Sequence, residues 1–444
     1  MYTIKDILRI EVAPALGCTE PAAVALCTAA AGSLLSDKTL KSLDLWLSPS
    51  IYKNAFAVAI PGTQGQVGID LAAALGVYGG DPRQKLQVLA PLNADHIAAA
   101  HQLIRKDGVH IHLLEKTAGI YIRTKLTGPN ETAEAVIETT HDNLVSLRHN
   151  DQPVTGSNLL SNLANAHSEL EELEQFLCEQ TLEDLLVLVK QLDDEDLAFL
   201  REGIQYNLDL AEHGMDFGCG LGVGKTLERL AREGLLKKDM VLDARILSSS
   251  ACDARMSGAK LPAMSSAGSG NHGLTAILPV WAVSKYLSDV NETDILKAIA
   301  LSHVVTGYIK SHTGRLSAAC GCSIAAGAGA TAGIAYLMGG NLKHIAGAIK
   351  NLLGDLAGVI CDGAKAGCSL KLATAAGTAV QSALFSLHGI DVKETDGIVA
   401  GTPEQTMKNM GQISTQGMID TDQTILQIMI EKKLTDRCLQ CPQK

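Results

Sequence analysis

Three cysteines stand at positions suited to an iron–sulfur cluster. Cys361 and Cys368 lie seven residues apart in the segment GVICDGAKAGCSL, and Cys322 lies 39 residues before Cys361 in ACGCSIAAGAG. This spacing favours a cluster over zinc, because zinc sites usually take four ligands in two close pairs, whereas clusters accept thiolates from separate loops. Unpaired cysteines are also among the most buried residue types, so buried free thiols are the alternative interpretation.

A further cysteine, Cys18, stands just before a predicted helix. Residues 20–35 are rich in alanine, with Thr19 placed to be the N-cap and Pro21 in the first turn. The helix dipole and the free N–H groups at a helix N-terminus favour a thiolate. We therefore expect Cys18 to be reactive, whereas Cys27, well inside the same helix, is expected to pack in the core.

Two polar segments could bind an anionic substrate. MSSAGSGNHGLTAILPV presents hydroxyl, amide and imidazole groups before a helix that we predict to begin near Gly273. Such a loop suits a carboxylate, although a well-capped helix start uses the same residue types. KSHTGRLSAACGC brings basic residues within one or two helical turns of Cys322. Such residues usually form ion pairs at the surface, but their position next to a candidate cluster ligand favours a role in substrate binding. The candidate binding residues are Ser265, Ser266, Ser269, Asn271, His272, Lys310, His312 and Arg315.

Two other motifs partly resemble known cofactor-binding motifs. The segment DFGCGLGVGKTLERL ends like a phosphate-binding loop, but position 219 is cysteine and position 223 is valine where the two glycine-rich fingerprints need glycine. We interpret it as a glycine-rich approach to a helix. Lys260 in SGAK could form a Schiff base with pyridoxal phosphate, which is the rival enzyme interpretation, although a lone loop lysine is usually solvated.

Composition narrows the class of protein. The chain has 444 residues, a net charge of −11 and only 3% aromatic residues, which argues against a nucleic-acid partner. Eleven cysteines and a charged N-terminal segment without a signal-peptide core favour a reducing, cytoplasmic location. Residues 318–340 are uncharged, but they are mostly alanine and glycine, so we predict a helix packed in a core and no membrane span.

The pattern of elements predicts an α+β protein. Strand-like segments recur between residues 40 and 150, namely LDLWLSPSIY, FAVAIPG, LQVLAPL, VHIHLLE, GIYIRTKLTG, TAEAVIETT and NLVSLRHN. Two helical segments lie between them, so residues 1–155 are predicted to form an α/β sandwich-type domain, with 149–158 as a linker. Residues 156–444 have mostly helical periodicity and are predicted to form a larger, mostly α-helical catalytic domain.

Several of these motifs occur together in one family. GCTEP at Cys18, AGSGNHG at 267–273, ACGCSIAAGAG at Cys322 and the loop from Cys361 to Cys368 stand in the same order as in the iron–sulfur L-serine dehydratases. The chain resembles more closely their relatives, the L-cysteine desulfidases and the proteins grouped with them. The resemblance covers almost the whole chain, and the seven-residue cysteine spacing resembles the desulfidase branch.

The resemblance implies a [4Fe-4S] cluster held by Cys322, Cys361 and Cys368, with the fourth iron free to bind substrate. Cys320 is a competing ligand, and Cys18 matches the cysteine that the family is thought to use as a base. The implied reaction is pyridoxal-phosphate-independent β-elimination from L-cysteine, a small-molecule amino-acid substrate, with L-serine dehydration as the alternative. Ser266, Ser269, Asn271 and His272 would hold the substrate, supported by His312 and Arg315. A non-enzymatic cluster-based sensor or helical binding protein is the alternative of another class, and a homodimer is the commonest assembly for such an enzyme.

Overall fold

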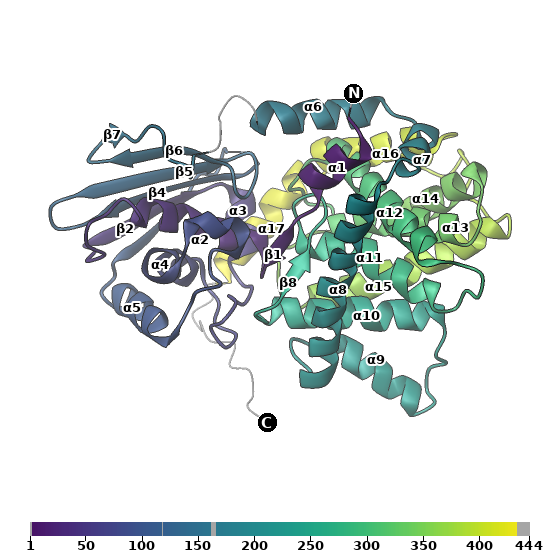
Figure 1. The fold of residues 1–444 in the computed structure, drawn as a ribbon, viewed down its shortest axis with the longest axis horizontal. Helices are drawn as coiled ribbons and strands as arrows, with labels where there is room; N and C mark the ends of the chain where they lie inside the picture. The colour runs from purple at the N-terminus through teal and green to yellow at the C-terminus, as the bar shows by residue number, and fades with distance from the viewer. Residues whose placement is uncertain (1, 118, 161–165, 433–444) are drawn as a thin grey trace.

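The protein consists of a sheet with helices on one side and a larger bundle of helices beside it (Figure 1). The computed structural model describes residues 2–117, 119–160 and 166–432. The arrangement confirms the α+β prediction, with the sheet in the N-terminal third of the chain and a larger helical C-terminal part.

The sheet has six strands in the order β3-β2-β4-β5-β6-β7. β2 and β3 are parallel, and every other neighbouring pair is antiparallel. Side chains along β2 and β4 alternate between buried and half-buried, as expected for a sheet covered on one face. The bounds are β2 (Ser42–Leu47), β3 (Val109–Leu113), β4 (Tyr121–Thr127), β5 (Thr132–Glu138), β6 (Leu144–His149) and β7 (Gln152–Pro153).

Helices α2 (Thr19–Gly32), α4 (Ile69–Gly79) and α5 (Ala94–Arg105) lie on one side of this sheet (Figure 1). Every residue of α2 is buried, because it packs between the strands and α4. A Cβ atom at Gly76 would lie 2.3 Å from the carbonyl oxygen of Ala25, so only glycine allows α2 and α4 to approach this closely.

Some predicted elements of this part are wrong. FAVAIPG and LQVLAPL form no strand; Ala59 makes one isolated bridge to Val67, and the second segment begins in the 3₁₀ helix Pro82–Gln87 and continues as a turn. Their apolar residues are buried without a partner strand, and burial alone does not distinguish a strand from a packed loop. The end of LDLWLSPSIY forms α3 (Pro49–Ala55), and part of the expected linker folds back as β7.

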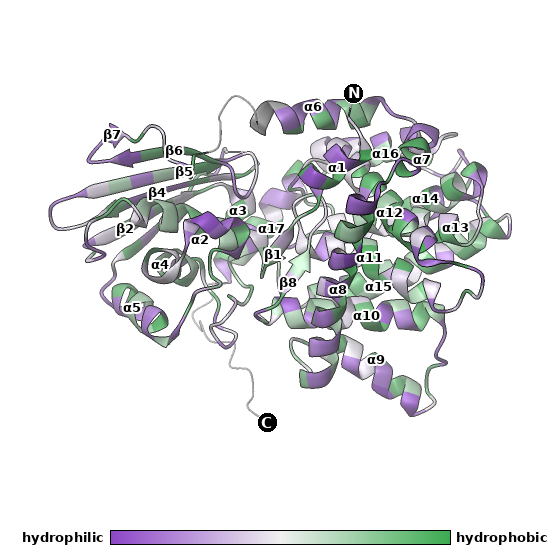
Figure 2. Ribbon diagram, viewed as in Figure 1, coloured by the Kyte–Doolittle hydropathy of each residue, from purple (hydrophilic) through white to green (hydrophobic). Residues whose placement is uncertain are grey.

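The helical part is built around α12, α10 and α15, whose neighbours complete a large hydrophobic core and a second, smaller apolar cluster beside α10. Its elements are α6 (Ala166–Glu179), α7 (Leu182–Val189), α8 (Asp194–Phe217), α9 (Val223–Arg232), α10 (Met240–Met256), α11 (Gly270–Ser284), α12 (Glu292–Thr313), the π-helix η2 (Cys322–Ala326), α13 (Gly327–Leu337), α14 (Leu342–Leu356), α15 (Cys368–Leu387), α16 (Pro403–Gln412), the π-helix η3 (Ile413–Gly417) and α17 (Ile419–Glu431). Hydrophilic and hydrophobic residues alternate along the outer helices α6 and α9 (Figure 2), as expected for helices with one solvated face.

The first residues of the chain belong to the helical part by their contacts. α1 (Ile4–Glu11) packs against α12, and β1 (Pro14–Leu16) pairs with β8 (Pro262–Met264). The chain then crosses to the sheet at α2. The domain boundary at residue 155 stays a prediction. It assigns α1 and β1 to the first domain, although both contact elements of the second. The C-terminal cysteines Cys438 and Cys441 lie outside the described residues.

The uncharged run 318–340 forms η2 and α13 inside this core. Cβ atoms at Gly329 and Gly333 would lie 2.3 and 2.5 Å from carbonyl oxygens of α12, so the small residues serve close packing of two helices. Within the described ranges, no helix is long and apolar enough to cross a membrane.

Candidate active site

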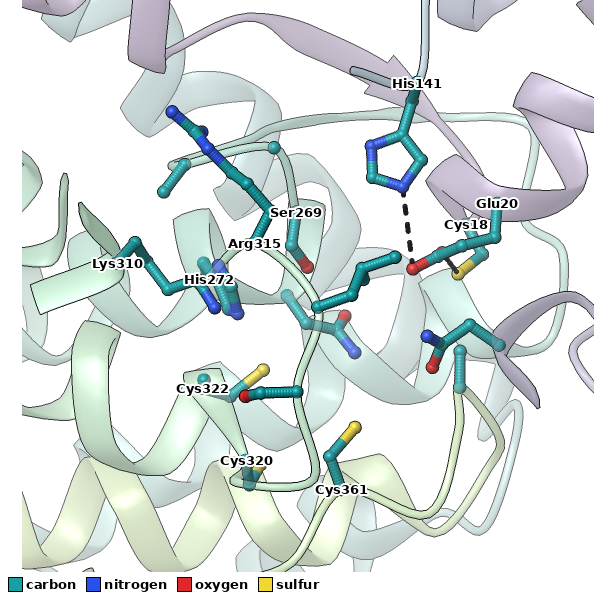
Figure 3. Close-up of a pocket in the computed structure, with 18 of the residues that line it drawn as sticks. Cys18, Glu20, His141, Ser269, His272, Lys310, Arg315, Cys320, Cys322 and Cys361 are labelled. Carbon is teal, nitrogen blue, oxygen red and sulfur yellow. Dashed lines mark hydrogen bonds and ion pairs between the residues drawn. The ribbon is translucent and has the colours of Figure 1, made fainter. Parts of the chain in front are cut away.

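A cavity lies where the sheet part meets the helical part, with about 890 Å³ of empty space, part of it open to solvent. Its wall comes from the start of α2, from α3 and from the connection between β5 and β6 on one side. The other side comes from α10, α12, the start of α11 and the loops that carry the predicted ligand cysteines (Figure 3). Both parts of the protein are therefore needed to form it.

All three predicted ligands, Cys322, Cys361 and Cys368, line this cavity, together with Cys320. Two loops bring them together through backbone hydrogen bonds. The N–H of Cys361 donates to the carbonyl of Ala318 at 2.6 Å, and the N–H of Cys320 donates to the carbonyl of Val359 at 2.8 Å. Cys368 enters from the first turn of α15. Residues distant in sequence thus form one thiol-lined wall.

The chemistry of this wall fits an iron–sulfur cluster better than a single metal ion. Among the residues that the structure describes, no three His, Cys, Asp or Glu side chains are placed to share one ion. Cluster thiolates bind different iron atoms and need not converge on one point. A hydrogen bond joins the thiols of Cys320 and Cys322, which lowers the pKa of the first and raises the pKa of the second. Either of these two cysteines is therefore available as the third ligand.

Cys18 also lines the cavity, but its protonation differs from the prediction. Cys18 itself is the N-cap of α2, in place of Thr19, and its thiol donates to Glu20 Oε2 at 2.9 Å. Burial and the Glu20 carboxylate raise the pKa of Cys18 well above its usual value, and the nearby Arg255 opposes them only partly. The expected thiolate is therefore disfavoured, because Cys18 is buried and the carboxylate of Glu20 lies beside it in the first turn of α2.

Glu20 and His141 are site residues that sequence reasoning missed. Glu20 accepts hydrogen bonds from Cys18 and from the Thr19 hydroxyl at 3.1 Å, and its Oε1 lies 3.8 Å from Nε2 of His141. Burial raises the pKa of Glu20, but His141 and Cys18 outweigh burial and lower it to about 2. Glu20 stands in the GCTEP motif, whereas nothing in the sequence marks His141, which comes from the β5–β6 connection.

The segment around the start of α11 contributes three of its five candidate binding residues. Ser269, Asn271 and His272 line the cavity, and the helix begins at Gly270, earlier than predicted. Asn271 Oδ1 accepts a hydrogen bond from Arg255 Nη1 at 2.8 Å, so Arg255, a third residue that sequence reasoning missed, fixes its orientation. Burial, and then Lys310, lower the pKa of His272 to about 3.

Ser266 and His312, which are also predicted to hold substrate, lie outside the cavity wall. The Ser266 hydroxyl is buried and lies 2.9 Å from Nδ1 of His303. His312 faces away, with Nδ1 3.6 Å from the sulfur of Cys178 and its ring against that of Tyr308. Both residues belong to the packing behind the site.

Arg315 reaches the cavity wall but is already bound by carboxylates. Its Nη1 and Nη2 donate to Glu11 at 3.0 and 2.7 Å, and its Nε donates to Glu174 at 2.9 Å. Burial opposes the guanidinium charge, but Glu11 and Glu174 outweigh burial and raise the pKa of Arg315. The arrangement therefore links α1 and α6 to the loop after α12.

The two motifs that imitate cofactor sites are not part of this cavity. In the glycine-rich segment, Asp253 accepts hydrogen bonds from the N–H groups of Leu221 and Gly224 at 3.2 and 3.3 Å. A carboxylate thus occupies the helix N-terminus where a phosphate would bind. This agrees with the interpretation of the segment as a glycine-rich approach to a helix. Lys260 is exposed.

The chain was compared with known protein families. The model of the serine dehydratase alpha chain matches residues 83–427, which is most of the chain and includes all four cavity cysteines of the helical part. This protein belongs to the serine dehydratase alpha chain family. The family points to a lyase-type enzyme in general, and its members are generally dependent on iron–sulfur clusters.

Relatives are similar along their full length. A UPF0597 protein of Desulfatibacillum aliphaticivorans is 56% identical over 436 residues, covering 98% of this chain and 99% of the relative. UPF0597 proteins of Desulfotalea psychrophila and Clostridioides difficile are 53% and 43% identical, covering 97% of this chain and 99% and 100% of the relatives. The family membership therefore applies to both parts of the fold.

Proposed function

We propose that the protein catalyses β-elimination from L-cysteine, without pyridoxal phosphate, to give pyruvate, ammonia and hydrogen sulfide. The observation that best supports this proposal is the single cavity that holds Cys18 and a wall of four further cysteines. Membership of the serine dehydratase alpha chain family supports the reaction class. L-Serine dehydration is the second candidate, because the two substrates differ only in the leaving atom.

In this proposal Cys322, Cys361 and Cys368 hold a [4Fe-4S] cluster, with Cys320 as the competing ligand. When bound, the cluster would supply a Lewis acid that stabilises the leaving sulfur or oxygen. The affinity of iron for thiolates favours cysteine over serine as the substrate. A cluster-based sensor would need the same ligands but would release no pyruvate, so product formation separates the two classes.

Cys18 is the proposed base that takes the α-proton. The pair of electrons from the broken Cα–H bond forms the Cα=Cβ bond, the β-sulfur leaves and is protonated to hydrogen sulfide, and the enamine hydrolyses to pyruvate and ammonia. A thiol with a raised pKa is a strong base once it has lost its proton. Arg255, which lowers the pKa of Cys18, would stabilise that thiolate. Ser269 and Asn271 would orient the substrate between these groups.

The test is product formation by protein purified without air. We expect L-cysteine to give equal amounts of pyruvate and sulfide, with about four irons per chain. Absence of pyruvate from both L-cysteine and L-serine, at full iron content, would exclude the proposed reaction.

Single substitutions test the ligands and the base separately. Cys361→Ser should lose iron, whereas Cys219→Ser, at a half-exposed cysteine away from the cavity, should keep it. Comparing Cys320→Ser with Cys322→Ser identifies the third ligand. Cys18→Ala should keep the iron and lose turnover; full turnover in this variant would remove Cys18 from the mechanism.

A further inference from the structure

Lys310 is a buried cation that faces the cavity without a partner. It lies near the end of α12, only 2% of it is exposed, and it lines the cavity. Among the described residues, its Nζ makes no hydrogen bond and no ion pair. Burying an ammonium group is unfavourable unless an anion or several hydrogen-bond acceptors compensate it. Its position therefore indicates that an anion belongs in the cavity.

The other cations of the wall are already bound. Arg315 is paired with two carboxylates, and Lys371 is paired with Asp362 and donates to the carbonyl of Ile360 at 2.7 Å. Arg255 donates to the carbonyl of Gly17 and to the Asn271 side chain. Lys310 differs from these three because none of the described residues accepts a hydrogen bond from its ammonium group.

The charge of the whole wall favours the same kind of ligand. The cavity is lined by four cationic side chains, those of Arg255, Lys310, Arg315 and Lys371, and by one carboxylate, that of Glu20. Glu20 is occupied by Cys18 and His141. Because Arg315 and Lys371 are paired with carboxylates, the charges that remain to attract a small anion are those of Lys310 and Arg255, and the buried Nε of Arg255 also has no partner among the described residues.

We propose that Lys310 binds the α-carboxylate of the amino-acid substrate, an inference that rests on the proposed function. Figure 3 shows Lys310 beside His272 and on the opposite side of the cavity from Cys18. Ser269, the N-cap of α11, makes no capping bond with its side chain, so its hydroxyl and the first N–H groups of α11 are further donors. A carboxylate held at Lys310 leaves the α-carbon between this anchor and Cys18, as proton removal requires.

Equilibrium binding of two unreactive probes tests this assignment. L-Alanine has the ammonium and carboxylate groups of the substrate but no leaving group, and L-alaninamide replaces the carboxylate with a neutral amide. Calorimetry on the anaerobic, iron-loaded, full-length protein should show tighter binding of L-alanine. Lys310→Met should weaken L-alanine binding about 10- to 100-fold, as for loss of a hydrogen bond to a charged group. Binding of L-alaninamide should change little.

Lys371→Met is the matched control, because it removes a cation from the same wall that already has a partner, while Asp362 keeps its ion pair with Lys365. It should leave the preference for L-alanine intact. Lys310→Arg, which keeps the charge, should restore part of that preference. Equal weakening by Lys310→Met and Lys371→Met, or no preference in the wild type, would overturn the assignment.

The thiolates that would hold a cluster are an alternative anionic partner for Lys310, because Cys361, Cys322 and Cys320 line the same cavity. If Lys310→Met loses iron but its iron-loaded fraction still prefers L-alanine, the lysine serves the cluster and the assignment is wrong. Pyruvate formation by the wild type tests the proposed function separately. Binding governed by Lys310 without turnover would contradict the reaction and keep the carboxylate site.

Discussion

Substitution of Arg315 should destabilise the protein far more than it affects substrate binding. The Glu11 side chain is 1% exposed and Arg315 is 18% exposed, and two hydrogen bonds join them at 2.7 and 3.0 Å. Among the described residues, Arg315 is the group that neutralises Glu11. Arg315→Met therefore leaves a carboxylate buried and unpaired between α1 and α12.

The size of the effect follows from that burial. Removing one partner of a buried ion pair typically costs about 3–5 kcal/mol, because the remaining charge loses its compensation. Glu174 is 29% exposed and can turn to water, so it adds little to the loss. Replacing both Arg315 and Glu11 by methionine removes the orphaned charge, and the double variant should recover most of the lost stability.

The assay is denaturant unfolding followed by circular dichroism, with the single and double variants in parallel. Because the chain has two parts, the shift of the first transition is the quantity to compare. Substrate affinity of Arg315→Met, measured below that transition, should stay close to the wild-type value. A stability loss under about 1 kcal/mol together with a large loss of affinity would show that Arg315 binds substrate and that its ion pairs are dispensable.

Three further predictions concern substitutions at Glu20, at Lys53 and at two glycines. Glu20 has a folded-state pKa of about 2, below its usual 4.5, so it adds stability that is present above pH 4.5 and is lost as the pH falls towards 2; Glu20→Gln should flatten the melting temperature over that range. Burial raises the pKa of the Cys361 thiol and the charge of the buried Lys53 opposes that rise, so Lys53→Met should slow alkylation of Cys361 in cluster-free protein, measured by mass spectrometry; an unchanged or faster rate would contradict this role. Gly273→Ala should destabilise the fold, because its Cβ would lie 1.8 Å from a backbone oxygen, whereas Gly354→Ala, at a helical position where a Cβ would make only ordinary contacts of 3.6 Å or more, should raise the melting temperature slightly.

Local patterns in the sequence predicted the helices and most strands, because periodicity records which face is buried. FAVAIPG was misleading for the same reason: its Val58 and Ile60 are buried as in a strand, but no neighbouring strand is there to pair with. Pairing depends on the rest of the chain, which a short window does not contain.

The site was predictable where one loop carries several of its residues, as with Ser269, Asn271 and His272. It was not predictable where orientation decides the role. Lys310 and His312 stand two residues apart on α12, and residues at that spacing face different sides of a helix, so only Lys310 reaches the cavity. His141 needs the long-range contact between the sheet and the helical part, for which no local pattern exists.

Lys53 connects the two halves of the proposed mechanism. It belongs to α3 of the sheet part, yet its ammonium group donates to the carbonyl of Cys361 at 3.2 Å and pairs with Asp422 near the start of α17. The loop that would hold the cluster is therefore fixed against the part of the protein that supplies Cys18. Since proton removal and leaving-group departure must act on adjacent carbons, an error in this contact would misplace one group relative to the other. The same buried lysine thus opposes the rise in the pKa of the Cys361 thiol caused by burial and aligns the two reacting bonds.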